Sequence, residues 1–393
     1  MIRYLLLFNF LIFLTANADG QWLKQTDTLI NHSRRIIPVD RAELLKNVDL
    51  IANMQYANNS NFQNGNYTGS AFALNQFRLE IKGLVFDSTV FFRFRNRYTR
   101  TPTVQSVDNI DHSVDMAFIG VNLSRRFTLS FGKMCADYGG YEFDANPINI
   151  YQYNDIVEQA DNFLTGAQFT WNATKNQQFA FQVLNARTQS FTDLYDSIPG
   201  IKAAKFASAL VGNWRGSFGS GIFSTFWSYS FITEASNKYV KYIALGNQLN
   251  LKKLLIQYDF KYMMDGLDRL GIVSALVPKS YSPYTALKTD YIEHWLRIQY
   301  NFTPQWNFTV IGMVDNAFWK GNSDANKNDH IRTAWGIIPS LEFYPYKKLD
   351  LKFFAAYVGR YYDYTTYAKA KFGLANSTTG QLLVGFISPL KFL

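Results

Sequence analysis

The chain has 393 residues, of which 48% are hydrophobic and 17% aromatic, and its formal net charge is +9. It contains one cysteine, Cys135, which excludes an intramolecular disulfide. The basic residues are spread along the chain and do not gather into a nucleic-acid-binding patch, so we expect no nucleic-acid partner.

The first apolar stretch of the chain has the features of an export signal. Arg3 precedes an apolar run over residues 4–15, and the small-x-small tripeptide A-N-A, which signal peptidase cleaves, follows at 16–18. The run is too short to cross a bilayer as a helical anchor. We therefore predict a signal peptide over residues 1–18, followed by a periplasmic lead-in without periodicity over 19–43.

The rest of the chain contains no window close to the roughly 20 unbroken apolar residues that a membrane helix needs. Membrane helices are thereby excluded, but membrane strands are not. A mean hydropathy of −0.15 is typical of strands that alternate polar and apolar residues between polar loops.

The most informative segment is residues 90–98, V-F-F-R-F-R-N-R-Y. In a β-strand, Arg93, Arg95 and Arg97 share one face, while Phe92 and Phe94 share the other with a valine. In a soluble sandwich the arginines would face water and the aromatics a core. Because the same alternation recurs along the chain, we favour a membrane barrel with the arginines in its lumen. The reverse facing would cost about 2–4 kcal/mol per arginine near the bilayer midplane.

Similar alternation predicts strands throughout the segment 44–393. After a first strand at 48–56, long and short connections alternate along the chain. We predict sixteen strands, near residues 48–56, 72–82, 90–98, 114–123, 127–135, 165–172, 178–186, 206–214, 221–231, 239–249, 253–262, 290–301, 305–315, 332–344, 349–360 and 380–392.

The connections that follow odd-numbered strands are the long ones: 58–71, 99–113, 136–163, 187–205, 232–238, 263–289, 316–331 and 361–379. Long external loops, short periplasmic turns and an even strand number are the architecture of outer-membrane barrels. The predicted fold class is therefore all-β, a transmembrane antiparallel β-barrel. With about 16 strands, side chains cannot fill the interior and an aqueous channel remains.

The third long connection, from Ala136 to Phe163, should set function. It contains no lysine or arginine and is unusually long for one compact domain, so we expect it to fold into the barrel. Opposite the arginine strand it would create a transverse electric field. The alternative is a solvated external loop. Its six carboxylates are Asp137, Glu142, Asp144, Asp155, Glu158 and Asp161.

Strand parity predicts which bases line the lumen: Arg78, Lys82, Arg93, Arg95, Arg97, Lys253, Lys261, Arg297, Lys352 and Arg360. Bases outnumber acids on the predicted wall, and the six loop carboxylates would offset this excess. We expect weak net ion selectivity together with a strong dipole across the pore.

Several sequence runs resemble the phosphate-selective porin O/P family of Gram-negative outer membranes. They are F-R-L-E-I-K-G (77–83), F-R-F-R-N-R (92–97), F-G-K-M-C-A-D-Y-G-G-Y-E-F-D-A-N-P-I (131–148), D-N-F-L-T-G (161–166) and A-L-G-N-Q-L-N (244–250). The resemblance implies a trimeric, sixteen-stranded passive channel in the outer membrane whose third loop enters the pore. It also implies phosphate or polyphosphate selectivity through a basic ladder at the position of Arg93, Arg95 and Arg97.

Other function classes find less support in the sequence. The four histidines are scattered, and no H-E-x-x-H, G-x-S-x-G or metal-spaced Cys/His cluster occurs, so we expect no catalytic residues, metal or cofactor. The expected partners are outer-membrane lipid, lipopolysaccharide, small hydrophilic solutes and ions, and two further copies in a homotrimer. A surface-exposed β-rich binding or adhesin protein is the alternative.

Overall fold

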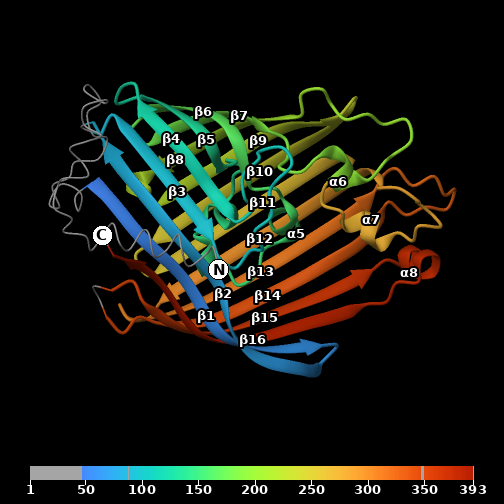
Figure 1. Cartoon of the computed structure of the whole chain (residues 1–393). Coiled ribbons are helices and arrows are strands. Elements are labelled where there is room, and N and C mark those ends of the chain that lie inside the picture. Colours follow the sequence, from blue (N-terminus) through green and yellow to red (C-terminus); the bar gives the residue numbers. More distant parts are fainter. Residues whose placement is uncertain (1–46, 87, 347–348, 393) are drawn as a thin grey trace, which may run out of the picture. The chain divides into compact units, whose positions relative to one another are not determined.

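The computed structural model describes residues 47–86, 88–346 and 349–392. The predicted signal peptide and lead-in, residues 1–18 and 19–43, lie outside these ranges. The described chain consists mainly of strands joined in one sheet (Figure 1).

Sixteen antiparallel strands in the described residues form one closed barrel, in which each strand pairs with its neighbours in sequence and β1 pairs with β16. The predicted fold class is confirmed. The strands are β1 (Val48–Gln63), β2 (Asn66–Val85), β3 (Val90–Arg97), β4 (Val114–Asn122), β5 (Phe127–Cys135), β6 (Phe163–Thr174), β7 (Gln177–Asn185), β8 (Ser208–Phe218), β9 (Phe223–Ala235), β10 (Lys238–Leu251), β11 (Leu254–Leu267), β12 (Leu287–Asn301), β13 (Trp306–Trp319), β14 (His330–Phe343), β15 (Lys352–Tyr364) and β16 (Ser377–Lys391).

The barrel presents large apolar side chains to its surroundings. Phe131, Ile337 and Val384 are each more than half exposed, whereas polar residues of the same strands are buried toward the interior. This arrangement is the inverse of a soluble protein and fits a lipid-facing wall, because exposed apolar area of this extent is unfavourable in water. Among the described residues, no helix combines the length and the apolar character needed to traverse a bilayer.

Two predicted loops are wrong. Residues 58–71 and 232–238 extend the flanking strands, so β1 and β2 are joined only by Asn64-Gly65, and β9 and β10 only by Ser236-Asn237. Asn64 and Gly65 both have positive φ, 49° and 80°, as a tight hairpin turn requires. Residues 58–71 are mostly polar, so their strands were predicted as a loop. The Asn64-Gly65 pair is nevertheless a sequence signature of a hairpin turn.

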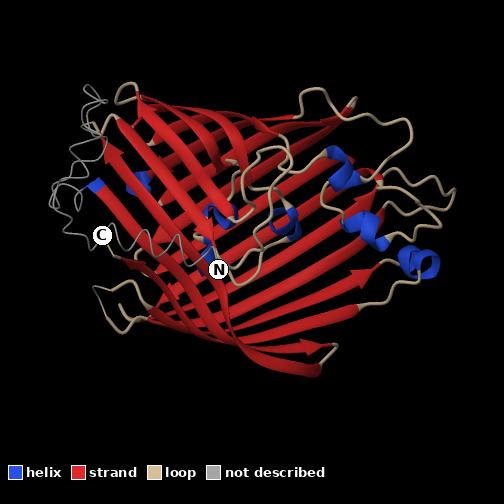
Figure 2. Cartoon of the chain, in the orientation of Figure 1, coloured by secondary structure: helices blue, strands red, loops and turns tan. Residues whose placement is uncertain are grey.

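In the part of the chain that the structure describes, the short helices lie in connections between strands (Figure 2). Residues 136–162, here called the inward loop, carry three of them and fold into the barrel, as predicted for this connection. The helices are α4 (Tyr141–Asp144), η1 (Pro147–Asn149) and α5 (Asp155–Gln159) in the inward loop, then α6 (Phe191–Tyr195), η2 (Gly219–Gly221), α7 (Ile272–Leu276) and α8 (Thr366–Phe372).

One side of the barrel interior is a packed apolar core. Ile156 of the inward loop belongs to a buried cluster that also includes Tyr242 of β10 and Met263 of β11. Ile148 of η1 belongs to a second buried cluster, which also includes Trp295 of β12. Apolar side chains therefore face inward where the inward loop covers them, and the open space lies on the other side of the loop.

Candidate functional site: a charged cavity beside the inward loop

A cavity of about 1190 Å³ lies between the inward loop and the inner faces of the first strands. Most of its wall comes from β2 to β7 and from the inward loop, with further residues from the β3–β4 and β7–β8 connections. Its charged lining residues are Arg78, Glu80, Arg93, Arg95, Arg97, Arg100, Asp137, Asp144, Glu158, Asp161 and Arg215, together with His112.

Three of the arginines share one buried carboxylate, that of Asp115 on β4. The distances from Asp115 carboxylate oxygens to guanidinium nitrogens are 3.6 Å for Arg78, 3.3 Å for Arg95 and 3.0 Å for Arg97. The Asp115 side chain is fully buried, so its charge is offset by the arginines rather than by water. Neighbouring guanidinium groups are thereby held together despite their mutual repulsion.

A β-bulge explains why Asp115 reaches the arginines. In the β3–β4 pairing Arg95 lies opposite Met116 and Asn96 lies opposite Val114, so Asp115 is an extra residue in β4. A bulge locally breaks the strict alternation of side chains. Both Asp115 and Met116 therefore face inward.

The three arginines of β3, here called the arginine row, have further contacts. Arg93 forms an ion pair with Glu80 at 2.8 Å and keeps a side chain that is 37% exposed. The guanidinium carbons of Arg95 and Arg97 lie 5.2 and 5.8 Å from the centre of the Phe163 ring, within range of a cation–π interaction. We call this inner face of β2 to β4 the arginine wall.

The inward loop is fixed to the opposite side of the barrel, here called the anchor wall, the inner face of β10 to β15. Asp259 of β11 accepts hydrogen bonds from the backbone N–H groups of Tyr141 and Glu142, at 2.9 and 2.8 Å. The Glu142 carboxylate in turn pairs with Lys261, and both side chains are fully buried. The start of α4 is thus held by charge on β11.

A second set of charges holds α5 against the same wall. Glu293 accepts a hydrogen bond from the backbone N–H of Ile156 at 2.5 Å. The Asp155 carboxylate pairs with Arg332 and with Arg360, the latter at 3.4 Å. A buried carboxylate that keeps such partners resists displacement, because separating them would leave charge in a low-dielectric interior.

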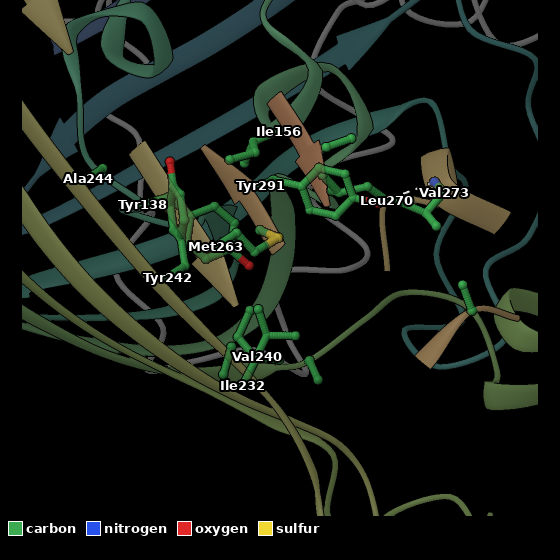
Figure 3. Close-up of a cluster of buried hydrophobic side chains, with 14 of the residues drawn as sticks. Tyr138, Ile156, Ile232, Val240, Tyr242, Ala244, Met263, Leu270, Val273 and Tyr291 are labelled. Atoms are coloured by element: carbon green, nitrogen blue, oxygen red, sulfur yellow. Dashed lines mark hydrogen bonds between the residues drawn. The ribbon is translucent and has the colours of Figure 1, made fainter. Parts of the chain in front are cut away.

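Apolar packing reinforces these polar anchors. Figure 3 shows Tyr138 and Ile156 of the inward loop packed among Tyr242, Met263 and Tyr291 of the anchor wall. The rings of Tyr138 and Tyr242 meet edge to face with centroids 5.9 Å apart. The inward loop is therefore a docked part of the barrel interior, with its free face toward the cavity.

The six predicted loop carboxylates divide between the two faces of the loop. Glu142 and Asp155 point to the anchor wall and do not line the cavity. Asp137 and Asp144 line the cavity and share Arg215 of β8, at 3.1 and 2.9 Å. Among the described residues, none of the six lies within 4.0 Å of the arginine row.

The other two loop acids, Asp161 and Glu158, differ in their partners. The Asp161 carboxylate accepts hydrogen bonds from the backbone N–H and the hydroxyl of Thr188, both at 2.8 Å. Glu158 has no side-chain partner among the described residues. Burial raises the pKa of Glu158, and repulsion by Glu142 raises it further.

The predicted basic residues also separate. Arg78, Arg93, Arg95 and Arg97 line the cavity. Lys82 instead pairs with Asp49 at 3.5 Å with a half-exposed side chain, and Arg297 donates to Gln299 at 2.7 Å; neither borders the cavity.

Four important residues were missed by the sequence reasoning. Asp115 is placed by a bulge, which period-two alternation does not reveal. Arg215 was assigned to a turn, but β8 continues to Phe218. Arg100 and His112 were left in an undivided loop, and no pattern in that loop pointed to the cavity.

The described residues contain no group of three or more His, Cys, Asp or Glu side chains arranged to hold a metal ion. Two histidines take part in local contacts: His294 Nδ1 lies 2.9 Å from the Tyr258 hydroxyl, and His330 Nε2 lies 3.0 Å from the Thr333 hydroxyl.

Comparisons with solved structures find similar barrels. The structure is similar to the outer-membrane channel DcaP of Acinetobacter baumannii, with a TM-score of 0.59 and 12% identity over 86% of this chain and 96% of that one. It is also similar to the trimer form of OmpT of Vibrio cholerae (TM-score 0.51, 10% identity, 86% and 98% covered). For OmpF of Salmonella typhi, crystallised with daunomycin, the TM-score is 0.51 and the identity 13%, with 86% and 97% covered.

At these identities the structural likeness shows the shared barrel fold. A comparison with curated protein sequences finds no significant match. The family model described as phosphate-selective porin O and P, in contrast, matches residues 47–386, which cover nearly the whole barrel. The chain therefore belongs to the phosphate-selective porin O and P family, and it is an outer-membrane β-barrel channel protein.

Proposed function

We propose that this channel is passive and water-filled and that small hydrophilic solutes and ions, including phosphate or other anions, diffuse through it. The observation that carries the proposal is the polar cavity of about 1190 Å³ beside a firmly docked inward loop. A docked loop narrows a barrel without closing it. Single-channel recording in a planar bilayer tests the proposal: purified protein should give ohmic steps in KCl, and an absence of conductance would contradict it.

The proposed constriction lies between the arginine wall and the free face of the inward loop. Arg78, Arg93, Arg95 and Arg97 would form its basic side. Lys82 of β2 and Arg297 of β12 would line the pore outside the cavity. Asp137, Asp144, Glu158 and Asp161 would form its acidic side. In this proposal Glu142 and Asp155 act as anchors of the inward loop.

Weak net ion selectivity follows from this proposed arrangement. The row of arginines is partly neutralised by Asp115 and Glu80, and Arg215 is neutralised by two loop acids. A pore in which most charges are paired has little net charge available to exclude one sign of ion. The reversal potential in a KCl gradient should therefore be small, and a strongly anion-selective reversal potential would contradict the proposed balance.

The assignment of the arginine wall can be tested at its most exposed member. Arg93→Gln leaves the cluster around Asp115 intact, and Lys82→Gln removes the same charge outside the cavity. We expect Arg93→Gln, but not Lys82→Gln, to change single-channel conductance and to shift the reversal potential toward K⁺. Equal effects of both variants would remove Arg93 from the constriction.

We further propose that three copies assemble in the outer membrane, surrounded by lipid and lipopolysaccharide. A free sheet edge supports this assembly: β3 pairs with β2 only from Arg78 to Val85, so the longer β1–β2 hairpin extends past it. Phe72 and Leu74 on this extension are 73% and 49% exposed. Unpaired strand edges with apolar side chains are usual places for another chain to dock.

Shortening the hairpin tests that assembly. Residues 58–72 would be replaced by Asn-Gly, which joins Ala57 to its cross-strand partner Ala73. We expect the unheated wild type to migrate as a trimer in a semi-native gel and the shortened variant as a conducting monomer. A trimer that persists in the variant would exclude the hairpin from the interface.

Export by the signal peptide at residues 1–18 and the absence of enzymatic activity complete the proposal. Mass spectrometry of the mature N-terminus in the outer-membrane fraction tests the first point. A chain that begins at Asp19 is the expected result, and a retained segment 1–18 would contradict it.

A further inference from the structure

Nearly every charged side chain that lines the cavity has a partner. Guanidinium groups pair with Asp115, Glu80 or the loop acids, and Asp161 is held by Thr188. Among the described residues, two charged lining groups form neither a side-chain hydrogen bond nor an ion pair: the guanidinium of Arg100 and the carboxylate of Glu158.

These two groups have opposite charges and come from different elements. Arg100 lies in the β3–β4 connection and Glu158 lies in α5 of the inward loop. Each feels the charge of the other, yet no N···O distance between them is within 4.0 Å. Glu158 is exposed to the cavity and Arg100 is half-buried at its edge. Both side chains line the same cavity of about 1190 Å³ and remain unpaired there, so a small molecule in the cavity can contact both charges.

We propose that Arg100 and Glu158 form a binding station for zwitterionic solutes, above all free α-amino acids, on their way through the channel. The inference rests on the channel function proposed above. Arg100 would hold the α-carboxylate, because a guanidinium presents N–H donors in a fork that matches a carboxylate. Glu158 would accept hydrogen bonds from the α-ammonium group.

The chemistry of the pair favours a zwitterion over solutes of one sign. A dianion that approached Arg100 would be repelled by Glu158, and a dication that approached Glu158 would be repelled by Arg100. The station has one cation and one anion, so it can pair with only one negative group and one positive group of a solute. A molecule that carries one positive and one negative group a few bond lengths apart satisfies both.

The surrounding groups leave this preference intact. Burial and the nearby Arg100 lower the pKa of His112, which favours the neutral form of its imidazole. Arg97, which also acts on Glu158, is already paired with Asp115. Asp161, whose charge also acts on Arg100, is held by two hydrogen bonds from Thr188. The other charges that act on Glu158 are those of Glu142 and Asp155, which point to the anchor wall.

The test uses four probes of nearly equal size: alanine, lactate, alaninamide and lactamide. They carry both charges, only the carboxylate, only the ammonium and neither charge, so their fluxes form a chemical double-mutant cycle. Efflux from liposomes that contain the full mature chain would be measured for each probe. We expect alanine to pass about 2- to 5-fold faster than the other three rates predict, which is the range for solvent-exposed ion pairs.

Variants assign this coupling to the two residues. Arg100→Gln and Glu158→Gln should each abolish the coupling, and the double exchange Arg100→Glu with Glu158→Arg should restore it, because a zwitterion can bind in the reverse orientation. Asp329→Asn, a carboxylate-to-amide control outside the cavity, should retain the coupling. KCl conductance of every variant verifies that the barrel is folded.

Two results would overturn the inference. They are alanine flux equal to the value predicted from the other probes, and coupling that survives both single glutamine substitutions. Wild-type protein that conducts KCl without coupling overturns the amino-acid station alone. Wild-type protein without conductance overturns the channel function and the station together.

Discussion

The arginine wall and the anchor wall are built from the same residue types but use them differently. On the arginine wall, Arg78, Arg95 and Arg97 share the carboxylate of Asp115, which belongs to β4 of the same wall. These ion pairs do not cross the barrel. On the anchor wall, Lys261 pairs with Glu142 of the inward loop, and the two groups are fully buried. The charged groups of the arginine wall lie beside the open cavity. Those of the anchor wall form ion pairs and hydrogen bonds with the inward loop.

This difference decides which sequence charges reach the channel. Glu142 and Asp155 belong to the inward loop but are neutralised by the anchor wall, whereas Glu158, three residues after Asp155, is free in the cavity. A count of loop acids therefore overestimates the negative charge that a solute meets. What matters is which face of the docked loop carries each side chain.

The largest predicted effect comes from breaking the anchor. Lys261→Met keeps a side chain of similar size but leaves Glu142 and Glu293 buried without their cation. Removal of one partner from a buried pair costs about 3–5 kcal/mol. We expect that loss in the free energy that docks the inward loop, measured by hydrogen exchange of its amides, together with increased cleavage of residues 136–162 by protease.

The matched control for this prediction is Lys320→Met, because Lys320 pairs with Asp329 at 3.5 Å while its side chain is 45% exposed. An exposed pair of this kind contributes little, so we expect the amide exchange of the inward loop to be unchanged. If Lys261→Met also left the exchange unchanged, apolar packing alone would hold the inward loop.

The next largest effect should come from the arginine wall. Asp115→Asn preserves shape but removes the one carboxylate among three guanidinium groups. We expect about 2–3 kcal/mol lower stability, because charged hydrogen bonds to a fully buried group are lost. The reversal potential should shift toward Cl⁻, since the arginines are no longer neutralised. Urea unfolding and bilayer recording measure the two effects, and an unchanged reversal potential would show that these charges are screened from the pore.

Features that depend on neighbouring residues could be predicted from the sequence, whereas contacts between residues far apart in the chain could not. Alternation of side chains is local, so the strand number, the facing of residues such as Arg95 and the entry of the third long connection could be derived. The anchor contacts join residues more than a hundred positions apart, as between Glu142 and Lys261. No local pattern contains that information.

Two local errors have identifiable causes. The bulge at Asp115 shifts the alternation by one residue, and only the pairing of β3 with β4 reveals it. Inward-facing Trp295 contradicts the expectation of a polar lumen, because the inward loop supplies Ile148 to cover it. An interior position is polar or apolar according to what packs on it, and that partner was unknown at the level of sequence.

A smaller effect is expected where the arginine wall is most exposed to water. Glu80→Gln breaks the ion pair with Arg93, whose side chain is 37% exposed. Because solvent reaches the Arg93 side of this pair, although Glu80 is buried, the variant should lose only about 0.5–1 kcal/mol of stability. The freed guanidinium should still raise the Cl⁻/K⁺ permeability ratio. A stability loss as large as that of Asp115→Asn would show that burial does not separate the two sites.

The smallest predicted effect is a pH dependence that comes from the free acid of the inward loop. The pKa of Glu158 is raised by burial and by Glu142, so Glu158 binds a proton at a higher pH than an ordinary glutamate does. As the pH falls from 7 toward 5, the cavity loses negative charge and Cl⁻ becomes favoured. We expect about a twofold change in the Cl⁻/K⁺ permeability ratio, because ions in the cavity screen a single charge. Reversal potentials across this pH range measure it, and Glu158→Gln should remove most of the change. If the full pH dependence persisted in that variant, the titrating group would be another member of the cavity lining, such as His112 or Asp137, or one of the anchored acids.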